Sequence, residues 1–102
     1  MARDVGAALT RSLAGTAAHA GCSIDLTAND WRRWASATFS GARHHLSFAG
    51  SPSLALENWI ARLGDLDVPM PGHLVADLTV AAVRRAPERV EVDLEVLTVE
   101  AD

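Results

Sequence analysis

The chain has 102 residues, of which 49% are hydrophobic and 22% are charged, and its formal net charge is −4. This length corresponds to one domain, and the composition is typical of a globular protein rather than a disordered one. No apolar run approaches the roughly 20 residues that a membrane helix needs. The charge is uneven, because residues 1–51 hold five Arg and three acids while residues 52–102 hold four Arg and ten acids.

Two features of the composition indicate source and compartment. Lysine is absent and all nine basic residues are arginine, which together with frequent alanine indicates a GC-rich bacterial coding bias. Cys22 is the single cysteine, so no internal disulfide can form. A lone cysteine fits a reducing environment, and we therefore expect a cytoplasmic bacterial protein.

The first expected element is a helix from about Arg3 to Ala20. Val5 and Leu9 begin an apolar stripe at helical spacing, and Gly21 is a typical helix end. The segment Cys22–Thr27 then alternates apolar and polar side chains. This alternation indicates a short strand or an extended link.

Residues 29–39 allow two interpretations. Asp30 could cap a helix that carries Trp31 and Trp34. Alternatively, the segment from Trp34 to Phe39 is a strand. We favour the strand because Ser40-Gly41, which follows it directly, is a candidate two-residue hairpin turn.

The residues after this turn alternate in polarity up to Phe48, as a second hairpin strand would. A two-residue turn at 40–41 places Ala37 opposite His44, which puts His44 on the inner, buried face. His45 then lies on the outer face, opposite Ser36, because adjacent strand residues point in opposite directions.

The second helix is expected to begin with Ser51 as N-cap and Pro52 at the first helical position. Gly64 would end this helix, and residues 65–72 would form a stiff connector containing two prolines. Its apolar stripe comprises Leu56, Trp59, Ile60 and Leu63.

The segment from Val90 to Val96 alternates strictly between apolar and acidic residues, which predicts a strand with one buried and one wet face. The run from Leu74 to Val83 is predicted as a second strand, with Leu74, Ala76, Leu78, Val80 and Ala82 on one face. The buried positions are even-numbered in both runs, which requires an odd loop such as Ala86-Pro87-Glu88. On the inner face Val80 would then oppose Leu94 and Leu78 would oppose Val96. The expected outer pairs are Val83–Glu91, Ala81–Asp93, Thr79–Glu95, Asp77–Leu97 and Val75–Val99.

These elements, in the order α-β-β-β-α-β-β, predict an α+β fold. The expected architecture is a two-layer sandwich, with a mostly antiparallel sheet of four or five strands and two helices on one face.

The sequence does not identify a chemical activity. The adjacent pair His44-His45 points to opposite faces of a strand, so we expect no metal site and no cofactor. Weak catalytic candidates are His44, Asp77 and Cys22. They would serve a small hydrolase or isomerase with a pocket between the sheet and the helices, which is the enzyme alternative.

Trp31-Arg32-Arg33-Trp34 is the most suggestive local cluster. It combines cationic and stacking groups, as surfaces that bind single-stranded nucleic acid do. The net charge of −4 argues against nucleic acid as a partner.

The function expected from the sequence is that of a homo-oligomeric binding or structural module. Val75, Leu97 and Val99 interrupt the otherwise polar outer face of the last hairpin, and the last strand could be an unpaired sheet edge. We therefore expect a homodimer built on these three residues. Its rim would be formed by Asp77, Glu91, Asp93 and Glu95.

Overall fold

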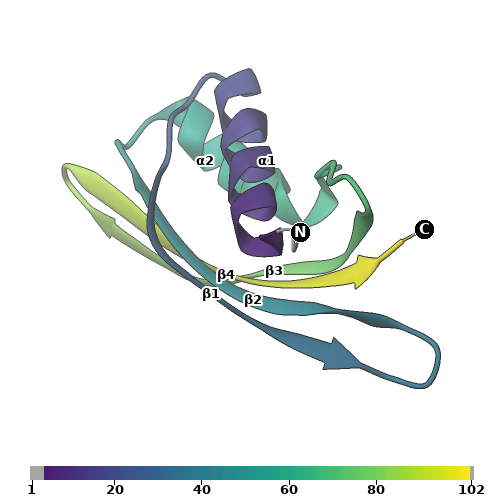
Figure 1. Cartoon of the computed structure of the whole chain (residues 1–102). Coiled ribbons are helices and arrows are strands. Elements are labelled where there is room, and N and C mark those ends of the chain that lie inside the picture. Colours follow the sequence, from purple (N-terminus) through teal and green to yellow (C-terminus); the bar gives the residue numbers. More distant parts are fainter. Residues whose placement is uncertain (1–3, 102) are drawn as a thin grey trace.

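The computed structural model describes residues 4–101, which form one open sheet with helices on one of its faces (Figure 1). In chain order the elements are α1 (Val5–His19), β1 (Asp25–Ala35), β2 (Ser40–Gly50), α2 (Leu54–Arg62), the 3₁₀ turn η1 (Leu63–Asp65), β3 (His73–Ala86) and β4 (Arg89–Glu100). All neighbouring strands are antiparallel, in the order β1-β2-β4-β3. The predicted α+β fold is confirmed, but the described chain has four strands in the element order α-β-β-α-β-β.

β1 accounts for the difference in strand count. It is one continuous strand of 11 residues, with a register shift between Leu26 and Ala28. It contains only the adjoining ends of the two expected extended segments, residues 25–27 and 34–35, and joins them through residues 28–33; the strand expected from Trp34 to Phe39 was therefore mostly wrong. The alternative helix beginning at Asp30 was wrong for the same reason. Every residue from Asp30 to Ala35 pairs with β2.

The first hairpin turns earlier than expected. The turn spans residues 36–39, where the Phe39 N–H donates to the Ser36 hydroxyl and the Ser36 N–H donates to the Phe39 carbonyl. Trp31 therefore opposes His44, and the predicted pairing of Ala37 with His44 was wrong.

Gly41, which the sequence suggested as a turn residue, instead lies within β2 between Trp34 and Val99. A Cβ atom at Gly41 would lie 1.9 Å from the Thr98 carbonyl oxygen. Glycine is therefore required here because β2 and β4 approach each other too closely for any side chain.

The helices begin at side-chain caps. The Asp4 carboxylate accepts from the Ala7 N–H at 3.1 Å, and the Ser53 hydroxyl accepts from the Leu56 N–H at 3.0 Å. The cap expected at Ser51 was wrong, because Ser51 and Pro52 precede the helix and Ser53 is the N-cap. Both helices cover the inner face of the sheet, which we define as the face toward α1 and α2; the opposite face is the outer face (Figure 1).

The second hairpin follows the predicted register only in its centre. Val80 opposes Leu94 and Leu78 opposes Val96, as expected. The loop is a two-residue turn at Pro87-Glu88 rather than three residues, and extra residues at Ala76 and Ala81 shift the pairing on either side. Of the five predicted outer pairs, Thr79–Glu95 and Asp77–Leu97 are therefore correct and the other three are displaced by one residue.

β4 lies between β2 and β3, so the expectation that the last strand is a sheet edge was wrong. Its even-numbered residues from Val90 to Thr98 are at most 3% exposed and form the centre of the core beneath the helices. Phe48 and Trp59 meet edge to face there, with ring centroids 5.1 Å apart. Leu78 and Val80 on β3 are only partly buried, because β3 is an edge strand.

Candidate functional site

His44 lies on the inner face of β2 and is 1% exposed, as the sequence predicted. Its Nε2 forms a hydrogen bond of 3.0 Å with the Thr98 hydroxyl, which also contacts the Ala42 carbonyl at 3.4 Å. Nδ1 is buried and has no hydrogen-bond partner in the described part of the chain. Burial, and secondly the charge of His73, lower the pKa of His44 to about 4. The ring is therefore neutral at neutral pH and is held as part of the core.

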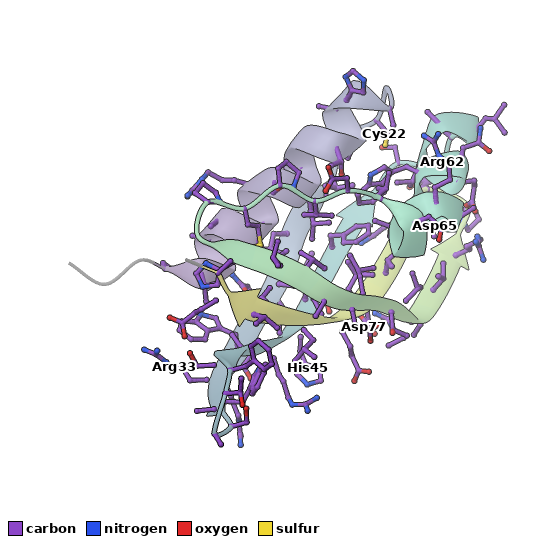
Figure 2. All side chains as sticks on the ribbon, turned by 90° about the vertical axis from the view of Figure 1, so that its right-hand side faces the viewer. Cys22, Arg33, His45, Arg62, Asp65 and Asp77 are labelled. Atoms are coloured by element: carbon purple, nitrogen blue, oxygen red, sulfur yellow. The ribbon has the colours of Figure 1, made fainter. Side chains whose placement is uncertain are left out.

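The three weak catalytic candidates do not come together. Asp77 projects from the outer face, on the opposite side of the sheet from His44, and accepts from the Thr79 hydroxyl at 3.3 Å (Figure 2). Cys22 follows α1, and its thiol donates to the Ala17 carbonyl at 3.4 Å. Burial raises the pKa of the Cys22 thiol, which disfavours the reactive thiolate. The pockets that residues of α1, α2, β1 and β2 form are lined by none of the three.

The other histidines are also dispersed. His45 lies on the outer face, as expected, but opposite Asp30 rather than Ser36. His73 begins β3 opposite Glu100. Among the described residues, no three His, Cys, Asp or Glu side chains gather closely enough to hold a metal ion.

The Trp31-Arg32-Arg33-Trp34 cluster does not form one surface. The pairing with β2 places Trp31 on the inner face against the core, and Trp34 on the outer face opposite Gly41. Arg33 reaches Glu100 at 3.8 Å, on the inner side of the hairpin. The tryptophans and arginines thus alternate between faces, and the stacking platform suggested by their sequence order is absent from this strand.

The outer face carries an apolar row at one end. The pairings align Trp34, Gly41, Val99 and Leu74 across all four strands of the described sheet, and we call this set the apolar row. Leu74 is 63% exposed there and, unlike an isolated surface leucine, it continues an apolar row.

The extra residue at Ala76 determines which β3 side chains belong to this face. Because of it, Val75 opposes Thr98 and packs against the core, whereas Leu74 opposes Val99 on the outer face. Of the three interface candidates, Leu97 and Val99 are therefore on the outer face and Val75 is not. Leu74 takes its place, and the sequence did not reveal this because the bulge reverses the parity of the strand.

The next row toward the centre is the arginine row, which consists of Arg32, Arg43, Leu97 and Asp77. Arg32 and Arg43 are directly opposite each other in β1 and β2, and like charges in this position are destabilising. Neither makes an ion pair with any residue in the range 4–101. This end of the outer face therefore has uncompensated positive charge beside an apolar surface.

The other end of the outer face is compensated within the chain. Arg84 contacts Asp93 at 2.7 Å and Glu91 at 3.4 Å, and Ser47 donates to Asp93 at 2.7 Å. Hydrogen bonds from Arg84 and Ser47 lower the pKa of Asp93 to about 2. Glu91 and Asp93, two of the four acids expected at the dimer rim, are thus held as carboxylates by donors of the same chain.

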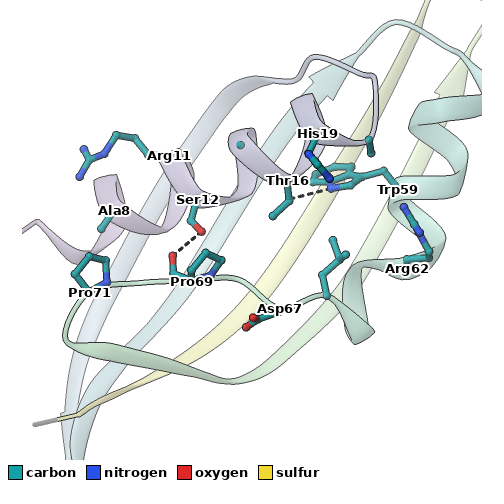
Figure 3. A pocket seen from close by; sticks show the side chains of 13 residues that line it. Ala8, Arg11, Ser12, Thr16, His19, Trp59, Arg62, Asp67, Pro69 and Pro71 are labelled. Atoms are coloured by element: carbon teal, nitrogen blue, oxygen red, sulfur yellow. Dashed lines mark hydrogen bonds between the residues drawn. The ribbon is translucent and has the colours of Figure 1, made fainter.

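The helical layer contains an open groove of about 1020 Å³ between α1 and the connector after α2 (Figure 3). Its walls are fixed by two hydrogen bonds, from Ser12 to the Pro69 carbonyl at 2.7 Å and from the Trp59 indole to the Thr16 hydroxyl at 3.0 Å. His19, Arg62, Arg11 and Asp67 line it. His19 and Arg62 each lie in the last turn of a helix, where a positive charge is favourable without any ligand, and Arg11 borders a second, smaller crevice as well.

No known protein family, curated protein or solved structure matches this chain. Within residues 4–101, neither helix is long and apolar enough to cross a membrane.

Proposed function

We propose that this protein is a homodimeric, non-catalytic module whose two copies join through the outer faces of their sheets. The observation that carries this proposal is the apolar row, where the 63% exposed Leu74 lies beside Val99 on a face whose other rows are mostly polar. A small domain gains most from burying such a surface, and two-fold dimers are the commonest way to bury it.

Charge complementarity selects the arrangement of the two copies. We place a two-fold axis parallel to the strands, between β2 and β4. This axis stacks each row on the same row of the partner and reverses the order of the strands, so that β1 lies over the partner's β3 and β2 over the partner's β4. Trp34 then faces the partner's Leu74, and Arg32 faces the partner's Asp77. The charge of Arg32 is thereby matched, whereas Arg43 faces the partner's Leu97.

The remaining rows are also compatible with this axis. His45 faces the partner's Glu95, and Asp25 faces the partner's Arg84. An axis perpendicular to the strands through the centre of the face would instead lay the apolar row on the charged row that contains Asp25 and Arg84. Because aligned sheets cross at about 30°, this arrangement requires the two sheets to cross near the apolar row and the arginine row.

The outer face is large enough for a stable interface. Four strands about 4.8 Å apart and five rows about 6.8 Å apart give a flat area of about 600 Å². Side chains raise the accessible area above this value, toward the roughly 800 Å² per partner of a standard interface.

The enzyme alternative has less support. It required a pocket in which His44 faces a second polar group, and His44 is enclosed by the core with Thr98 as its hydrogen-bond partner. Asp77 is on the other face of the sheet.

The first test compares matched substitutions on the two sides of the molecule. Leu74→Glu and Leu97→Glu should convert a dimer to a monomer, as measured by light scattering at high micromolar concentration. The control is Leu54→Glu, which introduces the same charge at a 78% exposed leucine on α2 and should leave the dimer intact. Wild-type protein that is monomeric at this concentration would refute the proposal.

The second test addresses the axis. Asp77→Arg alone should raise the dimer dissociation constant by about tenfold or more, because it creates a like-charge contact with the partner's Arg32. Combining it with Arg32→Asp should restore most of the affinity, whereas combining it with Arg62→Asp on the helical side should not. A double variant no better than Asp77→Arg would exclude this axis.

A further inference from the structure

A small apolar crevice lies on the inner side of the sheet, between α1 and the first half of β1. Its volume is about 230 Å³, and its floor is formed by Leu13, Leu46 and Phe48, each 2% exposed. Ile24 and Leu26 form the wall on the β1 side. Leu26 remains 46% exposed because nothing in the described chain covers this wall completely.

The sequence of α1 explains why the space is open. Val5, Leu9 and Leu13 are buried in the core, and beside Leu13 the crevice is lined on the α1 side by the small side chains of Thr10 and Ala14 and by Arg11. Protein interiors are normally packed to high density, so a helix flank of small side chains above apolar strand residues leaves a space that a larger residue would fill.

The polar groups of the crevice indicate the charge of a ligand. The Thr10 hydroxyl already donates to the Ala7 carbonyl at 3.0 Å. Arg11 also lines the crevice and has no ion pair with a described residue. It lies in the middle of α1, so a position at the helix C-terminus does not account for its charge, as it does for His19 and Arg62. A guanidinium group of this kind pairs best with a carboxylate through two parallel hydrogen bonds.

We propose that this crevice binds a short aliphatic carboxylate, with its apolar chain against Leu13, Leu26 and Phe48 and its carboxylate on Arg11. At about 30 Å³ per non-hydrogen atom, as in a condensed liquid, the crevice holds about eight such atoms, which is the size of hexanoate. The site is on the face opposite the proposed dimer interface, so the two proposals stand or fall separately.

The test is an NMR titration of the full chain, labelled with ¹⁵N, using butanoate, hexanoate and hexan-1-ol as probes. Hexanoate should cause saturable shifts at the amides of residues 10–14 and 24–26. Each CH₂ group should tighten binding about fourfold, so hexanoate should bind at least about tenfold more tightly than butanoate. Hexan-1-ol, which lacks the charge, should bind more weakly than hexanoate.

Two variants separate the roles of charge and shape. Arg11→Gln should reduce the affinity for hexanoate to that for hexan-1-ol and leave hexan-1-ol binding unchanged. Ala14→Phe should fill the crevice and abolish binding of both, and its amide spectrum shows whether it is folded; if it is not, the Arg11→Gln comparison decides. The proposal is overturned if hexanoate shows no saturation up to about 10 mM, if wild-type protein binds hexanoate and hexan-1-ol equally, or if folded Ala14→Phe binds like wild type.

Discussion

The inner and outer faces of β4 differ although their residues alternate along a single strand. The inner residues from Val90 to Thr98 are nearly inaccessible and are packed beneath two helices. The outer residues include Glu91, Asp93 and Glu95, and they interact with arginine, serine and histidine side chains at the surface. Stability is therefore determined on the inner face by packing, whereas the outer face is free to carry charge and a contact surface.

The largest expected effect is on the free energy of unfolding, and it compares two adjacent residues of β4 that lie on opposite faces. Leu94→Ala removes a 1% exposed side chain from the core and should lower the free energy of unfolding by about 2–5 kcal/mol. Glu95→Ala, one position along on the outer face, should change it by at most about 0.5 kcal/mol. Equilibrium denaturation measures both values in the monomeric Leu74→Glu background. Similar values for the two variants would contradict the assignment of faces.

Much of this arrangement could be predicted from the sequence, because alternation in β4 is strict and a one-residue slip would bury its acids. The two bulges in β3 could not be predicted in this way. Val75 and Ala76, and likewise Ala81 and Ala82, are apolar at both parities, so the pattern does not show where an extra residue is inserted. Each bulge then reverses which side chains reach the outer face, and this is why Leu74 was missed.

The first hairpin shows a second limit. A glycine after a serine is typical of a turn, but the same residue is required where two backbones approach closely, as at Gly41. Sequence proximity also placed Trp31 and Trp34 in one cluster although the strand separates them. The crevice beside Ala14 had no sequence signal, since it results from a side chain that is too small for its surroundings.

The next largest effect concerns His44, a polar residue on the apolar inner face, and the dependence of the free energy of unfolding on pH. In the folded protein the pKa of His44 is lowered to about 4, from 6.5 when the residue is free. The folded state therefore binds this proton less readily, and its stability is full above about pH 6.5 and is lost as the pH falls through 4. At about 1.4 kcal/mol per pKa unit the total loss is about 3 kcal/mol, of which about 2 kcal/mol should appear between pH 7 and pH 5.

Denaturation of wild type and of His44→Gln at both pH values measures this contribution. The glutamine variant cannot titrate, so its free energy of unfolding should change less between the two pH values, although it is less stable at pH 7. An equal change in both proteins would show that protonation of other groups causes the acid sensitivity.

The smallest expected effect concerns the helix that covers the inner face. Ser53→Ala removes the hydroxyl that accepts from the Leu56 N–H at 3.0 Å, and it should lower the free energy of unfolding by about 1 kcal/mol. Ser51→Ala, two residues earlier and exposed, is the matched control and should be nearly neutral. The cap acts only on the start of α2, which lies on the inner face. The affinity of the proposed dimer, which forms through the outer face, should therefore be the same in both variants. If Ser51→Ala were the more destabilising of the two, Ser51 rather than Ser53 would be the residue that caps α2, as the sequence first suggested.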